Sequence, residues 1–305
     1  MILCCGEALI DMLPRETNAG EAVFAPYPGG AVFNTAIALG RLGAQTGFFC
    51  PLSDDLFGER LRDALEASDV DHARCPAVDR PCTLAFVTLT DGQARYAFYD
   101  TGTALRDMAP LELPTLDSDV TALFFGGISL VGDPCGEGFA TLCADAGDRV
   151  VMLDPNIRPG FIRNEATYRA RLDAMLSRAD IVKVSDEDLH WLMGAGDVTE
   201  LAQALRERGP TVVIVTEGAQ GARAFYAGGV AHAAANRVEV VDTVGAGDTF
   251  NAGFLAALDE AGLLSRSALP DLTEDALRAA LALGAQVAAV TVSRAGANPP
   301  HRHEL

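Results

Sequence analysis

Short apolar runs alternate along this chain with longer stretches in which apolar residues recur at helical spacing. The runs predict buried strands over residues 2–5, 46–51, 123–127, 150–154, 181–184 and 211–215. The longer stretches predict helices over 31–42, 55–68, 136–146, 166–179, 201–208, 248–261 and 274–290. Repeated strand–helix units predict an α/β fold, with a mainly parallel central sheet and helices on both faces. Because no repeat, low-complexity tract or linker interrupts the pattern, we expect one domain over residues 1–305.

Residues 83–100 depart from this alternation. Two runs that suit strands, 83–90 and 95–100, flank Asp91-Gly92, a dipeptide that strongly favours a tight β-hairpin turn. The pattern fits a lid over a binding site and a plain edge hairpin equally well.

The run from Val240 to Phe254 carries the strongest chemical signal. Val240-Val241 suggest the end of a strand, and Gly245-Ala246-Gly247 precede a helix rich in small and apolar residues. The side chains of these three residues are too small to block the approach of a ligand to the backbone. The first helical turn presents unpaired N–H groups and positive partial charge. That combination suits a phosphate, and the carboxylate of Asp248 suits removal of a proton from a hydroxyl. Ordinary turn glycines and a helix-start carboxylate explain the run about as well.

Two better-known phosphate motifs are excluded at this run. A P-loop requires a lysine after its last glycine, and the only lysine of the chain is Lys183. A dinucleotide-binding fingerprint requires a third glycine where this chain has Phe250.

Polar residues also follow other predicted strands, where α/β sheets bind ligands. Asp11 lies just beyond the first strand, where it could face a ligand, although an aspartate in an ordinary turn is an equally good interpretation. Gly29-Gly30 precede a helix with Asn34 one turn inside it, and the run from Asp154 to Arg158 follows the strand over 150–154. Ser185 and the acidic residues after it read as helix-capping residues.

Composition excludes several classes of partner and site. The formal net charge is −19 without a basic run, so nucleic acid and anionic membranes are not expected partners. The seven cysteines never occur as Cys-x-x-Cys, which argues against disulfides and zinc and for a reducing compartment. Glu7 and Asp11 interrupt the apolar start, and the longest apolar run is too short to span a bilayer. We expect a cytoplasmic protein.

Together these motifs resemble the ribokinase-like (PfkB) carbohydrate kinases, and the fructokinases most closely, over essentially the whole chain. The C-terminal signature of that family is matched by residues 242–250 and its glycine motif by residues 29–34. Asp11 and the Asp154-to-Arg158 run complete the resemblance. The run Gly126-Gly127-Ile128-Ser129-Leu130 is more similar to fructokinases than to ketodeoxygluconate kinases.

The resemblance implies a role for each matching residue. Asp248 would be the general base, and the backbone of Gly245, Ala246 and Gly247 would hold the transferring phosphoryl group. The residues implied for the sugar are Asp11, Gly29, Gly30 and Asn34, and those for the nucleotide are Thr216, Gly218 and Gly221. Asn156 and Arg158 would lie near the phosphates or the substrate, with Arg158 stabilising charge. ATP and a small sugar are the implied ligands.

The implied metal arrangement departs from the family pattern. The family often carries Asn-x-x-Glu where this chain has Ser185 and, three residues later, Asp188. Ser185 is assigned to the nucleotide site and Asp188 to Mg²⁺, which ATP phosphates and water would mostly hold. A monovalent cation, K⁺, is implied near Asp242 and Thr243.

The resemblance also implies a small β lid, built from segments near 12–28 and 83–100, and a homodimer formed through it. The leading function is an ATP-dependent fructokinase. A kinase for 2-keto-3-deoxygluconate needs a basic residue for the acid group, and Arg95 is the candidate, while Asp100 would repel that acid. A catalytically silent sugar or nucleotide sensor is a third reading, which the presence of Asp248 disfavours.

Overall fold

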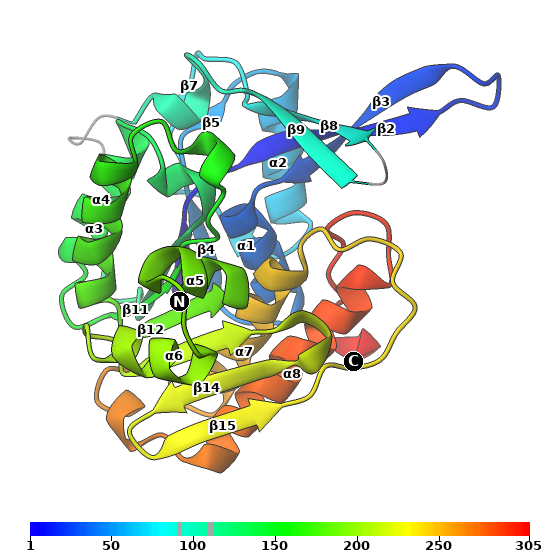
Figure 1. The fold of residues 1–305 in the computed structure, drawn as a ribbon. Helices are drawn as coiled ribbons and strands as arrows, with labels where there is room; N and C mark the ends of the chain where they lie inside the picture. The colour runs from blue at the N-terminus through cyan, green and yellow to red at the C-terminus, as the bar shows by residue number, and fades with distance from the viewer. Residues whose placement is uncertain (91–92, 109–112) are drawn as a thin grey trace.

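The computed structural model describes residues 1–90, 93–108 and 113–305, and its centre is a large sheet of buried strands (Figure 1). The strand order in this sheet is β15-β14-β13-β12-β11-β10-β1-β4-β6. Seven of these strands are parallel: β1 (Ile2–Cys5), β4 (Thr46–Phe49), β6 (Val70–Asp71), β10 (Ala122–Gly126), β11 (Val150–Asp154), β12 (Ile181–Ser185) and β13 (Val212–Thr216). Their apolar runs are buried on both faces, which confirms the α/β prediction.

Helices cover both faces of this sheet. One layer contains α3 (Cys135–Ala144), α4 (Glu165–Arg178), α5 (Asp186–Met193) and α6 (Val198–Arg206). The other contains α1 (Ala31–Arg41), α7 (Ala246–Glu260) and α8 (Glu274–Val292), with α2 (Leu56–Glu66) beside α1. α8 is long and apolar enough to cross a membrane, yet it packs along α7. A side chain on Gly253 of α7 would lie 2.8 Å from the Cα of Gly284 of α8, so two glycines allow this close packing.

A second sheet lies beyond the carboxyl ends of the central strands (Figure 1). Its order is β3-β2-β8-β9, and its strands are β2 (Leu9–Glu16), β3 (Ala22–Gly29), β8 (Leu84–Thr90) and β9 (Gln93–Tyr99). β8 and β9 pair antiparallel, which confirms the predicted hairpin, although its turn lies outside the described residues. β5 (Leu52–Ser53) and β7 (Ala77–Val78) form a further short pair.

Three sequence expectations about strands were wrong or incomplete. Val240 and Val241 end no strand: they are 60% and 61% exposed, and the backbone N–H of Val241 donates to the carbonyl of Val292 at the end of α8. β14 (Ala222–Tyr226) and β15 (Gly229–Ala233) form an antiparallel hairpin that was missed, because alanine-rich runs favour strands weakly. Asp11 lies inside β2 and not at the end of β1.

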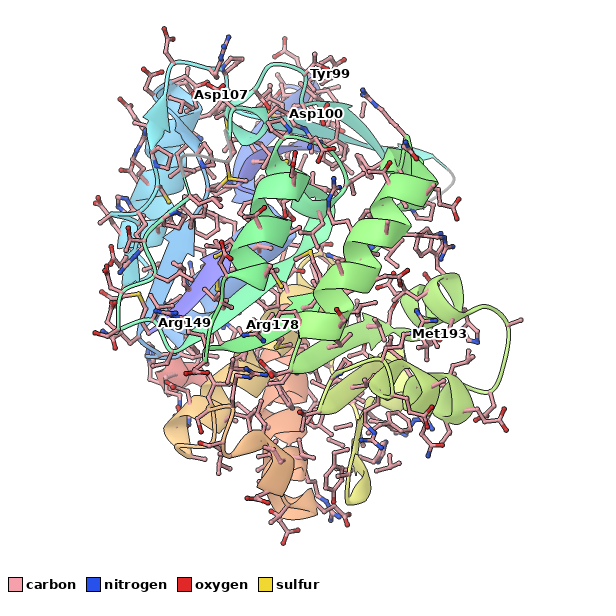
Figure 2. All side chains as sticks on the ribbon, turned by 90° about the vertical axis from the view of Figure 1, so that its left-hand side faces the viewer. Tyr99, Asp100, Asp107, Arg149, Arg178 and Met193 are labelled. Atoms are coloured by element: carbon pink, nitrogen blue, oxygen red, sulfur yellow. The ribbon has the colours of Figure 1, made fainter. Side chains whose placement is uncertain are left out.

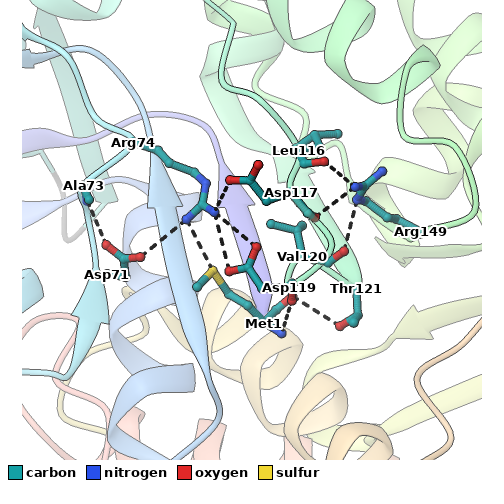
Figure 3. A network of polar contacts seen from close by, with 10 residues as sticks. All are labelled: Met1, Asp71, Ala73, Arg74, Leu116, Asp117, Asp119, Val120, Thr121 and Arg149. Carbon is teal, nitrogen blue, oxygen red and sulfur yellow. Dashed lines mark hydrogen bonds and ion pairs between the residues drawn. The ribbon is translucent and has the colours of Figure 1, made fainter.

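The amino ends of the central strands are held by two arginines (Figure 3). The Arg74 guanidinium lies 3.3–3.4 Å from the carboxylates of Asp71, Asp117 and Asp119. Arg149 donates to the carbonyls of Leu116, Asp117 and Val120. This edge of the sheet is therefore occupied by loops bound to one another, and two cavities lie at the opposite edge.

Candidate active site

Two neighbouring cavities lie over the carboxyl ends of the central strands. The first, of about 600 Å³, has a mixed polar lining, whereas the second, of about 800 Å³, is lined mostly by apolar side chains and glycines. Both are lined by Thr216, Gly218, Thr243, Ala246 and Gly247. The cavities therefore meet at the first turn of α7, and we call them the polar cavity and the apolar cavity.

Gly245 starts α7 in a conformation that favours glycine. Its φ is 80°, in the left-handed region, and a side chain there would lie 2.7 Å from Cβ of Ala297. The N–H of Thr249 makes the first intrahelical bond, to the carbonyl of Gly245. The N–H groups of Gly247 and Asp248 precede that bond, so they are available at the helix end. This end can bind an anion.

The Asp248 side chain lies in the wall of the polar cavity and is only 8% exposed. Its Oδ2 accepts a hydrogen bond of 2.9 Å from Nδ2 of Asn34, and its carbonyl accepts one from Oγ1 of Thr35. Burial raises the pKa of Asp248 to about 7, although the Asn34 hydrogen bond opposes the shift. A carboxylate with a pKa near neutrality is suited to accept a proton from a hydroxyl.

Glu7 contributes a buried carboxylate that sequence reasoning missed. Its oxygens accept hydrogen bonds from the N–H groups of Ala31, at 2.9 Å, and Ser129, at 3.1 Å. Gly127, with φ 67°, leaves room for it, because any side chain there would overlap the Glu7 carboxylate. Burial raises the pKa of Glu7. Glu7 thus joins the start of α1 to the loop after β10. The sequence feature that could have identified Glu7 is its position in a Gly-Glu pair directly after a buried strand.

Asp11 reaches the polar cavity from β2. A side chain on Gly29, in the neighbouring strand, would overlap the Asp11 carboxylate, so glycine is required there. Burial, helped by the charge of Asp242, raises the pKa of Asp11 to about 6. Phe98 of β9 and Phe161 also line this cavity, with ring centroids 4.4 Å apart in an edge-to-face arrangement.

A buried polar cluster lies beneath the first turn of α7. Asp154, at the end of β11, accepts hydrogen bonds on Oδ2 from Nζ of Lys183, at 3.0 Å, and from Nδ2 of Asn251, at 2.7 Å. Its Oδ1 accepts the N–H of Asn156. Lys183 lines the polar cavity although it is only 4% exposed. The sequence predicted that Asp154 ends a strand, but no pattern in the neighbouring residues predicted that Lys183 would contact it.

Ser185 and Asp188 lie where β12 runs into α5. Oγ of Ser185 accepts the N–H of Asp188, which makes Ser185 the N-cap, and Asp188 Oδ1 accepts the N–H of Ile157. Burial raises the pKa of Asp188, as does the nearby charge of Asp154. In the described residues, no three His, Cys, Asp or Glu side chains are grouped to hold a metal ion. A metal here would need ligands from a bound molecule and water.

Most of the residues predicted for the site come together at the two cavities. Those lining the polar cavity are Asp11, Gly30, Asn34, Asn156, Arg158, Ser185, Asp188, Thr216, Gly218, Thr243, Gly245, Ala246, Gly247 and Asp248. Gly221 lines the apolar cavity. Asp242 lines neither the polar nor the apolar cavity. Its oxygens accept the N–H groups of Val244 and Gly296, both at 3.0 Å, and so join two loops.

Arg95 and Asp100, in the strand predicted over residues 95–100, were expected to bear on the choice of substrate. The side chain of Arg95 lies outside the described residues, so its contact with a sugar stays a prediction. Asp100, which is labelled in Figure 2, was expected to repel an acidic substrate. Its carboxylate instead pairs with Arg106 at 2.6 Å and lines a different cavity. Its charge is therefore neutralised by Arg106 in a neighbouring cavity, which shares Phe98 and Phe161 with the polar cavity.

The chain is similar to known proteins over most of its length. Residues 1–304 match the model of the pfkB family of carbohydrate kinases. The chain is 53% identical, over 279 residues, to a fructokinase of Rhizobium leguminosarum bv. trifolii, covering 91% of this chain and 86% of that protein. It is 35% identical to a fructokinase of Klebsiella pneumoniae, covering 88% of each.

A solved structure of similar fold extends the comparison. The fructokinase with bound ATP from Xylella fastidiosa superposes with a TM-score of 0.88 and 30% identity, covering 97% of this chain and 93% of that one. Because the family model spans nearly the whole sequence, the chain belongs to the pfkB family of carbohydrate kinases and has its ribokinase-like α/β fold.

Proposed function

We propose that this protein transfers the γ-phosphoryl group of ATP to a hydroxyl of fructose. The observation that carries the proposal is that a polar and an apolar cavity meet at the first turn of α7, beside the Asp248 carboxylate. The fructokinases among its relatives supply the identity of the sugar, and the bound ATP of the Xylella protein supplies that of the donor.

The reaction follows from the position of Asp248. The carboxylate takes the proton of the sugar hydroxyl, whose oxygen forms a bond to the γ-phosphorus. The bond from that phosphorus to the β,γ-bridging oxygen breaks, and its electron pair leaves with ADP. The N–H groups of Gly247 and Asp248 at the end of α7 stabilise the negative charge on the transferring group. Arg158, on the same cavity, adds positive charge.

The charges of the polar cavity favour a neutral sugar over an acid. Among the described residues, six carboxylates line it: Glu7, Asp11, Asp186, Glu187, Asp188 and Asp248. The cations that line it in the same part of the chain are Arg158 and Lys183, and Lys183 is already paired with Asp154. A carboxylate substrate such as 2-keto-3-deoxygluconate would meet repulsion and costly desolvation here, whereas sugar hydroxyls can donate hydrogen bonds to these oxygens.

The apolar cavity is the proposed site for the adenine and ribose of ATP. Gly218 and Gly221 line it and have φ values of 53° and 96°, and a side chain on Gly221 would overlap the carbonyl of Ala233. Thr216, at the end of β13, lies between the two cavities. The nucleotide would therefore extend from the apolar cavity toward Gly247, with its phosphates at the junction.

Mg²⁺ fits this cavity as an ion that arrives with ATP. Asp188 and its neighbours Asp186 and Glu187 supply carboxylate oxygens, the ligand type that Mg²⁺ prefers, without forming a closed cage. When bound, the ion neutralises phosphate charge. We also propose K⁺ near Thr243 and Asp242, whose carboxylate holds the loop beside the first turn of α7.

Substrate preference tests the assignment directly. In a panel assayed with ATP, we expect fructose to give a higher kcat/KM than 2-keto-3-deoxygluconate, and Asp11→Ala to reduce its use sharply. Asp100→Ala is the matched control, since that carboxylate faces another cavity and should change kcat/KM little. A preference for 2-keto-3-deoxygluconate that Arg95→Ala abolishes would overturn the fructokinase assignment.

The pH dependence of turnover should report the Asp248 carboxyl. A general base works only when deprotonated, so kcat/KM for fructose should fall as the pH drops below about 7, the pKa to which burial raises Asp248. The measurement is a pH profile at saturating ATP. The same decrease in kcat/KM below pH 7 should persist in Asp11→Asn, which removes a second carboxyl of the polar cavity, one whose pKa is raised to about 6. Full activity down to pH 5 would contradict this role.

We further propose that the β3-β2-β8-β9 sheet is a lid and a dimer interface. Its exposed large apolar residues include Val23, Phe24, Tyr27 and Tyr99, which are 38–63% exposed. Phe24 packs edge to face on Phe86 with ring centroids 5.0 Å apart, so the aromatic surface continues into the sheet. Sedimentation should show a dimer that Phe24→Glu converts to monomer. A monomeric native protein would rule out the dimer.

A further inference from the structure

Lys183 is the only lysine among the 23 lysine and arginine residues of the chain. It lies in β12, a central strand that is otherwise apolar along its buried length, and is 4% exposed. A buried cation is costly unless it is paired or has a function. At every other basic position this chain uses arginine, so the compact ammonium group at position 183 requires an explanation.

The ammonium group lies directly beneath the proposed phosphate site. A Cβ added to Gly247 would be 3.0 Å from Nζ of Lys183, so Nζ is adjacent to the turn that presents the N–H groups of α7. Lys183 also lines the polar cavity. A planar arginine head is larger than an ammonium group and would crowd this turn.

The hydrogen bonds of Lys183 leave donors available. An ammonium group has three N–H donors, and among the described residues its recorded acceptor is Oδ2 of Asp154, at 3.0 Å. The same oxygen also accepts from Asn251. Asp154 thus holds the ammonium in place while other N–H groups remain for an acceptor that enters the cavity.

We propose that Lys183 is a further catalytic residue, which donates hydrogen bonds to the phosphoryl group as it passes from ATP to the sugar. This inference rests on the proposed kinase function. Lys183 stays protonated throughout, because the hydroxyl proton goes to Asp248 and the leaving electron pair to ADP. Its charge adds to that of the α7 N-terminus, in a cavity where the described residues include six carboxylates that would otherwise repel the polyphosphate.

The competing explanation is that Lys183 only neutralises Asp154. Lys183→Met removes the ammonium at nearly constant volume, and Asp154→Asn/Lys183→Met removes both charges. We expect both proteins to lose about 100-fold in kcat, a loss typical for one transition-state donor, with KM for fructose little changed. Wild-type kcat in a folded single variant, or its recovery in the double variant, would overturn the inference.

A second measurement needs no variant, because the chain has a single lysine. Labelling with [ε-¹³C]lysine gives one Cε resonance, from Lys183. That resonance should shift when the non-hydrolysable β,γ-methylene analogue of ATP is added, and adenosine, which lacks phosphates, should leave it in place. An unchanged resonance with the analogue at saturation would overturn the contact.

The two experiments separate this inference from the proposed function. If the wild-type protein phosphorylates no sugar but the Lys183 resonance responds to the analogue, the kinase assignment fails and the phosphate contact stands. If the wild-type protein phosphorylates fructose and the Lys183→Met variant turns over equally fast, the function stands and the role of Lys183 is wrong.

Discussion

Asp248→Asn is expected to lower kcat by about 10³-fold, within the range that general bases contribute, and to leave the protein folded. The amide has the shape of the carboxylate and can still accept the hydrogen bond from Asn34. It cannot take the hydroxyl proton. Substrate binding should change less than kcat, because the lost interaction matters mainly as the proton moves.

Stability should move in the opposite direction to activity. Burial raises the pKa of Asp248 from its ordinary range near 4 to about 7, so the folded state disfavours the charged form. That penalty is absent below the unfolded pKa near 4, grows as the pH rises toward 7, and is fully present above the folded pKa of about 7. At pH 8 the neutral Asp248→Asn protein should therefore melt at the same or a higher temperature than the wild type.

Thermal melts and steady-state kinetics on the same preparations check this prediction. The matched control is Asp259→Asn, which changes an exposed aspartate near the other end of α7 and should preserve kcat. Near-normal kcat in folded Asp248→Asn protein would remove Asp248 from the role of base.

Gly247→Val is expected to abolish most turnover while fructose binding survives. The added side chain would occupy the junction of the two cavities, where the phosphates must approach, and would contact Nζ of Lys183. Strain in the turn is not the cause, because Gly245 and not Gly247 has the left-handed φ. Titration calorimetry should show weakened ATP binding and little change for fructose.

The control for this substitution is Ala261→Val. Ala261 is exposed, follows the carboxyl end of α7 and lines neither the polar nor the apolar cavity, so the valine is added far from their junction. That variant should keep its activity. ATP turnover that persists in Gly247→Val would place the phosphates elsewhere.

The sequence alone determined those features that are local along the chain. Apolar runs such as 150–154 and 211–215 predict buried strands, and hence a parallel sheet between helices. Gly245-Ala246-Gly247-Asp248 predicts a helix start open to an anion, because glycine spacing and helix polarity are properties of a few consecutive residues.

Tertiary structure decided which distant side chains meet. Lys183 and Asp154 are separated by 29 positions and meet because their strands, β12 and β11, are neighbours in the sheet. Asn34 and Asp248 are separated by 214 positions and meet because α1 packs against α7. The same packing leaves Val240 and Val241 exposed over α8 and pairs Asp100 with Arg106 outside the polar cavity. Local patterns encode burial and turn geometry, whereas the distance between two side chains depends on how whole elements pack.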